Sequence, residues 1–155
     1  MKKAFTMIEL IFIIVIIGIL SVIAIPKLTA TRTDAKVSSV LANLRQVSID
    51  CKSFFSAKGE REWINAQVNL VTNVPLYKDN KCEEKANDGT TFVGNLIYIC
   101  DDDESIIKFD ANNTHLTVKK GSSSSPIAQD VYSSNVFKSL STPNGIRLGG
   151  INVVR

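Results

Sequence analysis

An apolar run near the start of the chain constrains the fold more than any other feature. Sixteen consecutive residues, from Leu10 to Ile25, carry no charge. The wider segment Phe5–Ile25 has 21 residues and a single charged one, Glu9. About 20 apolar residues in an α-helix cross the hydrocarbon core of a bilayer, whereas a helix on a soluble domain keeps a polar face. We therefore predict a membrane-spanning helix.

The residues that flank this run indicate how it is used. Lys2 and Lys3 precede it, as in a signal peptide, but the apolar run is longer than a signal-peptide core and ends in Pro26-Lys27 without a small-residue cleavage site. Lysines in a short N-terminal tail favour a cytoplasmic start. The sequence thus predicts a retained single span and an exported C-terminal part.

The remainder of the chain has a different composition. It comprises about 130 of the 155 residues, is rich in Ser, Asn, Thr and Lys, and is of a size typical of one domain. The formal net charge is +3, and the Lys and Arg residues are spread along the sequence. This distribution does not indicate a nucleic-acid-binding protein, which concentrates basic residues on one surface.

Glu9 needs an explanation, because a carboxylate in a membrane span is costly and usually has a charged partner. The surrounding string, KKAFTMIELIFIIVIIGILSVIAIPK at residues 2–27, resembles the N-terminal signature of the type IV pilin-like family of pilins and pseudopilins. The match consists of a short basic leader, a small residue, the Phe-Thr-Met-Ile-Glu string, a long apolar run with one glycine, and a proline before a basic residue.

This resemblance implies specific roles for several residues. A membrane-embedded prepilin peptidase would cut between Ala4 and Phe5, and the new amino group of Phe5 would be methylated. Ala4 stands where the family usually has Gly. Glu9 would neutralise the ammonium group of Phe5 in a neighbouring subunit when the helices bundle into a filament. Gly18 and Pro26 are assigned a structural role, a bend in the helix.

The predicted organisation has three parts: a cleaved leader at 1–4, a transmembrane and filament-core helix at 5–26, and an exported globular domain at 27–155. The helix is expected to continue over 27–58 and to stop at Gly59. Its apolar residues recur at spacings of three and four, which predicts one buried stripe: Val37, Val40, Leu41, Leu44, Val47, Cys51, Phe54 and Phe55.

The region from about residue 90 to 155 is predicted to form an antiparallel sheet with loops. Three strand-like runs, 95–100, 105–110 and 114–119, are separated by short turns. Residues 146–154 are expected to add an edge strand, and the serine-rich stretch 121–126 a flexible loop. The fold class is therefore α+β, a long helix packed on a small antiparallel sheet, which is also the fold that the resemblance implies.

The chain has three cysteines, an arrangement that allows one disulfide and leaves one thiol. We favour Cys82–Cys100, which would link the loop before the sheet to the first strand. Cys51–Cys100 is the alternative, since both residues could face the interface between helix and sheet.

The acidic string Asp101, Asp102, Asp103 and Glu104 has two interpretations. Several carboxylates in a short loop suit calcium, and some pseudopilins bind it, but the Asp-x-Asp-x-Asp-Gly spacing of a dedicated calcium loop is missing. A solvated hairpin turn is preferred, and no cofactor is expected. His115 lies in a predicted strand without a nucleophile motif around it, so no enzymatic activity is expected.

The preferred function is a structural subunit that assembles through its N-terminal helix into a type II secretion pseudopilus and takes part in protein secretion. The alternatives are a type IV pilus subunit for adhesion, motility or DNA uptake, and a monomeric membrane-anchored binding domain. The expected partners are prepilin peptidase, other pilin or pseudopilin subunits, the inner-membrane assembly machinery and membrane lipid, without nucleic acid. The expected location is the bacterial inner membrane, with the C-terminal domain in the periplasm or outside the cell.

Overall fold

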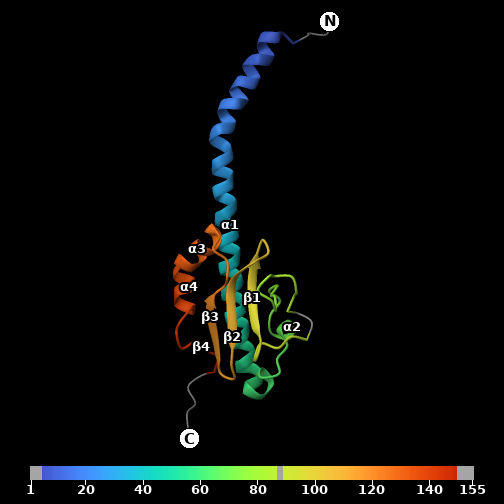
Figure 1. Ribbon diagram of the computed structural model, residues 1–155, viewed down its shortest axis with the longest axis vertical. Helices are drawn as coiled ribbons and strands as arrows, with labels where there is room; N and C mark the ends of the chain where they lie inside the picture. The colour runs from blue at the N-terminus through green and yellow to red at the C-terminus, as the bar shows by residue number, and fades with distance from the viewer. Residues whose placement is uncertain (1–4, 87–88, 150–155) are drawn as a thin grey trace. The chain divides into compact units, whose positions relative to one another are not determined.

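A computed structural model describes residues 5–86 and 89–149 of the chain, except for the side chains of residues 25, 26, 28 and 29. The chain divides into two compact units, Met1–Ala35 and Lys36–Arg155. Helix α1, Met7–Trp63, begins in the first unit and ends in the second (Figure 1).

The first unit is helical from Met7 onward, and its apolar side chains face outward. The 18 residues Met7–Ala24 have a mean hydropathy of 3.0, and none of them is buried. The backbone keeps a helical conformation at Gly18 and Pro26. The side chain of Pro26 lies outside the described residues, so the bend expected there stays a prediction.

Gly59 interrupts α1 as predicted, because its dihedral angles (φ 79°, ψ 175°) lie outside the helical range. A residue with positive φ is tolerated best when it has no Cβ. The prediction that the helix stops there was nevertheless incomplete, since helical residues continue to Trp63. The Trp63 ring is fully buried, stacks on Phe92 with ring centroids 5.6 Å apart, and donates its Nε1–H to the Asn112 carbonyl. This packing of Trp63 stabilises the helical residues that follow Gly59.

The second unit contains one antiparallel sheet with the strand order β1-β2-β3-β4. The strands are β1 Leu96–Asp101, β2 Glu104–Ala111, β3 His115–Lys120 and β4 Ile146–Arg147 (Figure 1). The three predicted strands are confirmed to within about one residue. The predicted edge strand is present but has only two residues, and residues 150–154 lie outside the described part of the chain.

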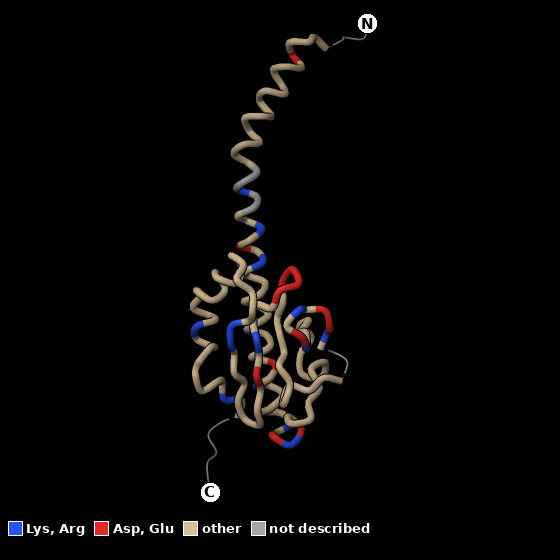
Figure 2. Tube along the Cα trace, in the orientation of Figure 1, with Lys and Arg blue, Asp and Glu red and all other residues tan. Residues whose placement is uncertain are grey.

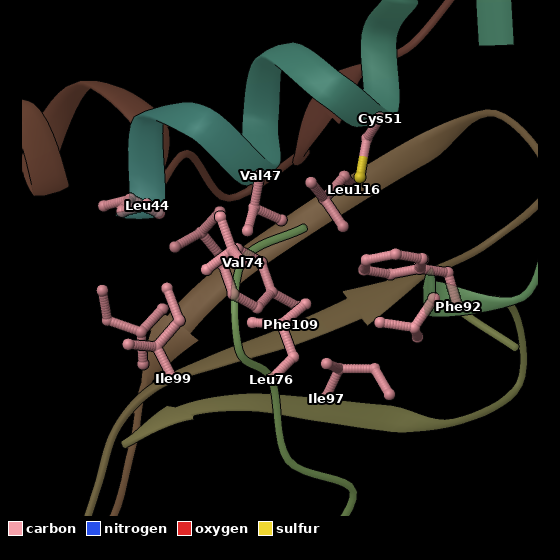
Figure 3. Packing of buried hydrophobic residues seen from close by; sticks show 14 of the residues in the cluster. Leu44, Val47, Cys51, Val74, Leu76, Phe92, Ile97, Ile99, Phe109 and Leu116 are labelled. Carbon is pink, nitrogen blue, oxygen red and sulfur yellow. The ribbon is translucent and has the colours of Figure 1, made fainter. Parts of the chain in front are cut away.

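The predicted apolar stripe of α1 forms the core together with the sheet. Val40, Leu44, Val47 and Cys51 are buried, and Figure 3 shows Val47 and Cys51 directed from the helix toward the sheet. The rest of the stripe is partly buried against the same cluster. The 3.6-residue period therefore identified the buried face correctly.

Three short helices were not predicted: α2 Val68–Val71, α3 Pro126–Ser133 and α4 Asn135–Leu140. The serine-rich stretch 121–126 was predicted to be a flexible loop, and this was wrong at its end. Ser125 caps α3 by accepting from the Ala128 N–H, with Pro126 in the first turn. Serine before proline is a standard helix start, so the sequence did carry this signal.

Candidate functional site

Thr6 and Glu9 form a reciprocal capping box at the start of α1. The Thr6 N–H and its Oγ1–H both donate to Glu9 Oε2, at 2.9 and 2.6 Å, and the Glu9 N–H donates to Thr6 Oγ1 at 3.4 Å. These bonds satisfy N–H groups that a helix start otherwise leaves unpaired. Figure 2 shows that the first part of α1 consists almost entirely of uncharged residues.

The sequence prediction singled out Glu9 but missed Thr6. The signal was available, because Ser or Thr followed three residues later by Glu, just before an apolar run, is the capping-box pattern. The structure adds that Glu9 has a partner within its own chain. A carboxylate offers about four lone-pair sites on two oxygens, so Oε1 can accept a further donor while Oε2 holds Thr6.

The surface around Glu9 is apolar. Large side chains from Phe5 to Ile23 are exposed, among them Phe5 at 78%, Met7 at 80% and Phe12 at 66%. Monomeric soluble domains rarely expose a continuous apolar surface of this kind. Ala4 lies outside the described residues, so the expected cleavage between Ala4 and Phe5 stays a prediction.

The acidic string forms the tip of the β1–β2 hairpin. Asp101 pairs with Glu104, and the two residues between them, Asp102 and Asp103, both have positive φ (46° and 63°). This is the conformation of a two-residue hairpin turn, and aspartate tolerates it better than most residues. The preferred interpretation, a hairpin turn, is confirmed.

Lys36 pairs with two of the carboxylates in this turn. Its Nζ contacts the carboxylate of Asp102 and lies 3.1 Å from Asp101 Oδ2. These two partners raise the pKa of Lys36 above its ordinary value. Among the described residues, no group of three or more His, Cys, Asp or Glu side chains is placed to hold a metal ion. The geometry at this turn is that of an ion pair with Lys36.

The disulfide joins Cys82 and Cys100, as favoured from the sequence, with Cα atoms 6.1 Å apart. It links the loop before the sheet to β1. Cys51 is a free thiol that is fully buried, and burial raises its pKa well above the ordinary value. A buried thiol is a poor nucleophile because it does not ionise, so Cys51 acts as an apolar core residue.

A curated protein supports the resemblance. The chain is 43% identical over 57 residues to the type IV major pilin protein PilA of Myxococcus xanthus (strain DK1622). The matched segment of the chain is similar to a type IV pilin. The match covers 37% of this chain and 26% of that protein, so the chain spans about a quarter of the length of this relative.

The architecture agrees with the match, since the chain has a long N-terminal helix with an exposed apolar segment, followed by an antiparallel four-stranded sheet. No family model matches the chain, and no solved structure matches it. The structure and this relative together therefore carry the functional argument.

Proposed function

We propose that this chain is a structural subunit, not an enzyme, that assembles through the N-terminal part of α1 into a membrane-anchored filament. The observation that carries the proposal is the exposed apolar segment Met7–Ala24 with one carboxylate, Glu9, in its first turn. In a simple membrane anchor this carboxylate would only cap the helix start through Thr6. A bundle of identical helices, each with an N-terminal ammonium group, has a further use for it.

In this proposal the apolar segment would serve first as a membrane anchor and later as the core of the filament. Before assembly, lipid covers the side chains that the folded unit leaves exposed. After assembly, the same side chains pack against those of neighbouring subunits. A heterologous contact of this kind, repeated without closure, produces an open helical filament.

Glu9 would set the register between neighbours. We propose that prepilin peptidase cuts between Ala4 and Phe5, so that Phe5 carries the new ammonium group. In the filament core, the Glu9 carboxylate of one subunit would meet this ammonium group of the next. An unpaired charge in an apolar bundle costs several kcal/mol, so only the stagger that pairs the two groups is stable. The capping box with Thr6 holds the Glu9 side chain at the helix start beforehand.

Two filament types suit this arrangement. The relative is a type IV major pilin, which favours a pilus subunit over the type II secretion pseudopilus that the sequence alone suggested. The inner-membrane location, the exported second unit and the assembly machinery are part of the same proposal. The disulfide supports the exported location, because disulfides form in oxidising compartments.

The decisive test is Glu9→Gln in cells that produce filaments from this chain. Glutamine can keep the capping box with Thr6 but removes the negative charge. Breaking a buried ion pair costs about 3–5 kcal/mol, so we expect at least a tenfold loss of sheared filaments while the amount of subunit in membranes is unchanged. The intact mass of the subunit reports whether residues 1–4 are removed and one methyl group is added.

Ile13→Leu, a volume-conserving change one turn further along the same segment, is the matched control and should assemble normally. Normal filament yield from the Glu9→Gln variant would refute the role of the charge. A subunit of unprocessed mass that reaches the membrane but never forms filaments would favour the anchored binding domain instead.

A further inference from the structure

A cleft opens on the second unit between α1 and the segment around α2. Its volume is about 450 Å³, within the range of about 300–1,000 Å³ that is usual for small-molecule sites. One wall consists of Asn43, Gln46 and Asp50, whose spacings of three and four place them on one face of α1. Residues 69–75 form the other wall.

A carboxylate joins the two walls of this cleft. Gln46 Nε2 on α1 donates to Asp50 Oδ1 at 2.7 Å, and Thr72 Oγ1 on the opposite wall donates to Asp50 Oδ2 at 2.6 Å. Thr72 is buried, and its Oγ1 also accepts the Val74 N–H at 3.2 Å. These bonds hold the cleft in shape before any ligand enters, which lowers the cost of binding.

Three carboxamide groups on the two walls are left for a ligand. The side chains of Asn43, Asn69 and Asn73 line the cleft, and none of them makes a hydrogen bond to another residue in the part of the chain that the structure describes. Each carboxamide carries two N–H donors and an acceptor oxygen. The cleft therefore presents unpaired donors and acceptors from both walls.

The charge of the cleft limits the class of ligand. Asp50 is the only charged side chain among the described residues that line it, so an anion would meet this carboxylate without a lysine or arginine to offset the repulsion. A hard metal ion requires several oxygen ligands that are free to coordinate, whereas both Asp50 oxygens already receive hydrogen bonds. An apolar ligand would separate the carboxamides from water without replacing their hydrogen bonds, which is costly. These arguments favour a neutral, polar ligand.

Hydroxyl groups match this lining best. A hydroxyl donates one hydrogen bond and accepts up to two, so two neighbouring hydroxyls can pair with the N–H and the C=O of one carboxamide. Leu70, which lines the same cleft, is 67% exposed and offers apolar surface. A sugar ring combines both features, because its hydroxyl groups lie around its edge and its C–H groups cover its faces.

We propose that this cleft binds one unit of a neutral saccharide, through hydrogen bonds with the carboxamides of Asn43, Asn69 and Asn73 and apolar contact with Leu70. This site goes beyond the proposed role as a filament subunit. It does not depend on assembly, because every residue that lines it belongs to the second unit. A failure of filament assembly in the Glu9→Gln variant would leave sugar binding unchanged.

The test uses saturation-transfer NMR on the full chain, unassembled in a detergent without a sugar headgroup. The probes are four neutral sugars: glucose, galactose, mannose and N-acetylglucosamine. We expect transfer from the protein to the ring protons of at least one of them, with a signal that saturates as the sugar concentration rises. The double variant Asn69→Ala/Asn73→Ala should bind that sugar about tenfold more weakly, since it loses two hydrogen-bonding groups. Both side chains are exposed, so the variant should fold like the wild type.

Asn113→Ala is the matched control and should bind the sugar as the wild type does, because Asn113 is an exposed asparagine outside the cleft lining. Equal affinity of the double variant and the wild type would overturn the proposal. An equal loss in the control would overturn it too, as would the absence of saturable transfer to all four sugars. Triglycine tests the competing occupant, a peptide main chain. Saturable transfer to triglycine alone, lost in the double variant, would refute the saccharide and assign the cleft to a peptide.

Discussion

Asp79 shows how a single side chain can organise a loop of the second unit. Its carboxylate accepts backbone N–H bonds from Glu84 at 2.8 Å, Lys81 at 3.0 Å and Glu83 at 3.2 Å. These donors, that of Glu84 first, lower the pKa of Asp79 below its ordinary value of 3.8. They act on the loop that carries Cys82, whose own φ is positive at 62°.

This loop gives a prediction at the scale of one residue. Because the pKa is lowered on folding, the carboxylate stabilises the fold above pH 3.8, and that contribution is lost as the pH falls through the lower folded-state pKa. We expect Asp79→Asn to be less stable than the wild type at neutral pH, and the difference to shrink in acid. Urea unfolding at a series of pH values measures it.

Asp130→Asn, a change of the same charge on α3, controls for net charge at neutral pH. A deficit in Asp79→Asn that stayed constant from neutral pH to strong acid would mean that the carboxylate charge is not what holds the loop.

At the scale of one element, the second half of α1 has a buried face and an exposed face, which differ in how much they contribute to the stability of the second unit. Leu44 is fully buried in the core, whereas Ile49 on the same helix is 57% exposed. Both residues are large and aliphatic, so their difference isolates the effect of burial. Figure 3 shows Leu44 on the side of the helix that faces the sheet.

We predict that Leu44→Ala lowers the free energy of unfolding of the second unit by about 2–5 kcal/mol, through lost burial and the cavity left behind. Ile49→Ala should change it by no more than about 0.5 kcal/mol, as is usual at exposed positions. Urea unfolding of both full-length variants makes the comparison. Similar losses in the two variants would mean that the exposed face is also packed.

At the scale of the whole molecule, the chain combines a segment that needs an apolar environment with a unit that holds a disulfide. Thiols in the cytosol stay reduced, so the oxidation state of the cysteines in cells reports on which side of the membrane the second unit lies.

We predict that the chain, denatured without reductant from membranes, binds one thiol reagent, at Cys51, and three after reduction. Gel shift with a polyethylene-glycol maleimide counts the labels. Three labels without reduction would place the second unit in the cytosol.

The disulfide also gives a stability prediction. The double variant Cys82→Ser/Cys100→Ser should have a free energy of unfolding about 3 kcal/mol lower than that of the wild type, given the sequence separation of 18 between the two cysteines. The wild type under reducing conditions should show the same loss.

Features set by local pattern could be predicted from the sequence. The apolar segment follows from composition, the buried stripe of α1 from a period of 3.6 residues, and the first three strands from alternation between turn residues. The capping box of Thr6 and Glu9 belongs here as well, although it was overlooked. Each of these depends on residues within about one or two turns of one another.

Features that depend on distant residues were decided by the tertiary structure. Lys36 meets Asp101 across 65 positions, and Trp63 bonds to Asn112 across 49. The short helices α3 and α4 are too short to be stable alone and rely on buried Val131 and Phe137. Strand register likewise places Lys108 of β2 opposite Lys119 of β3. The sequence by itself determined the apolar segment, the long helix and the first three strands, while only folding determined the short helices and which charges meet, because these depend on which distant segments pack together.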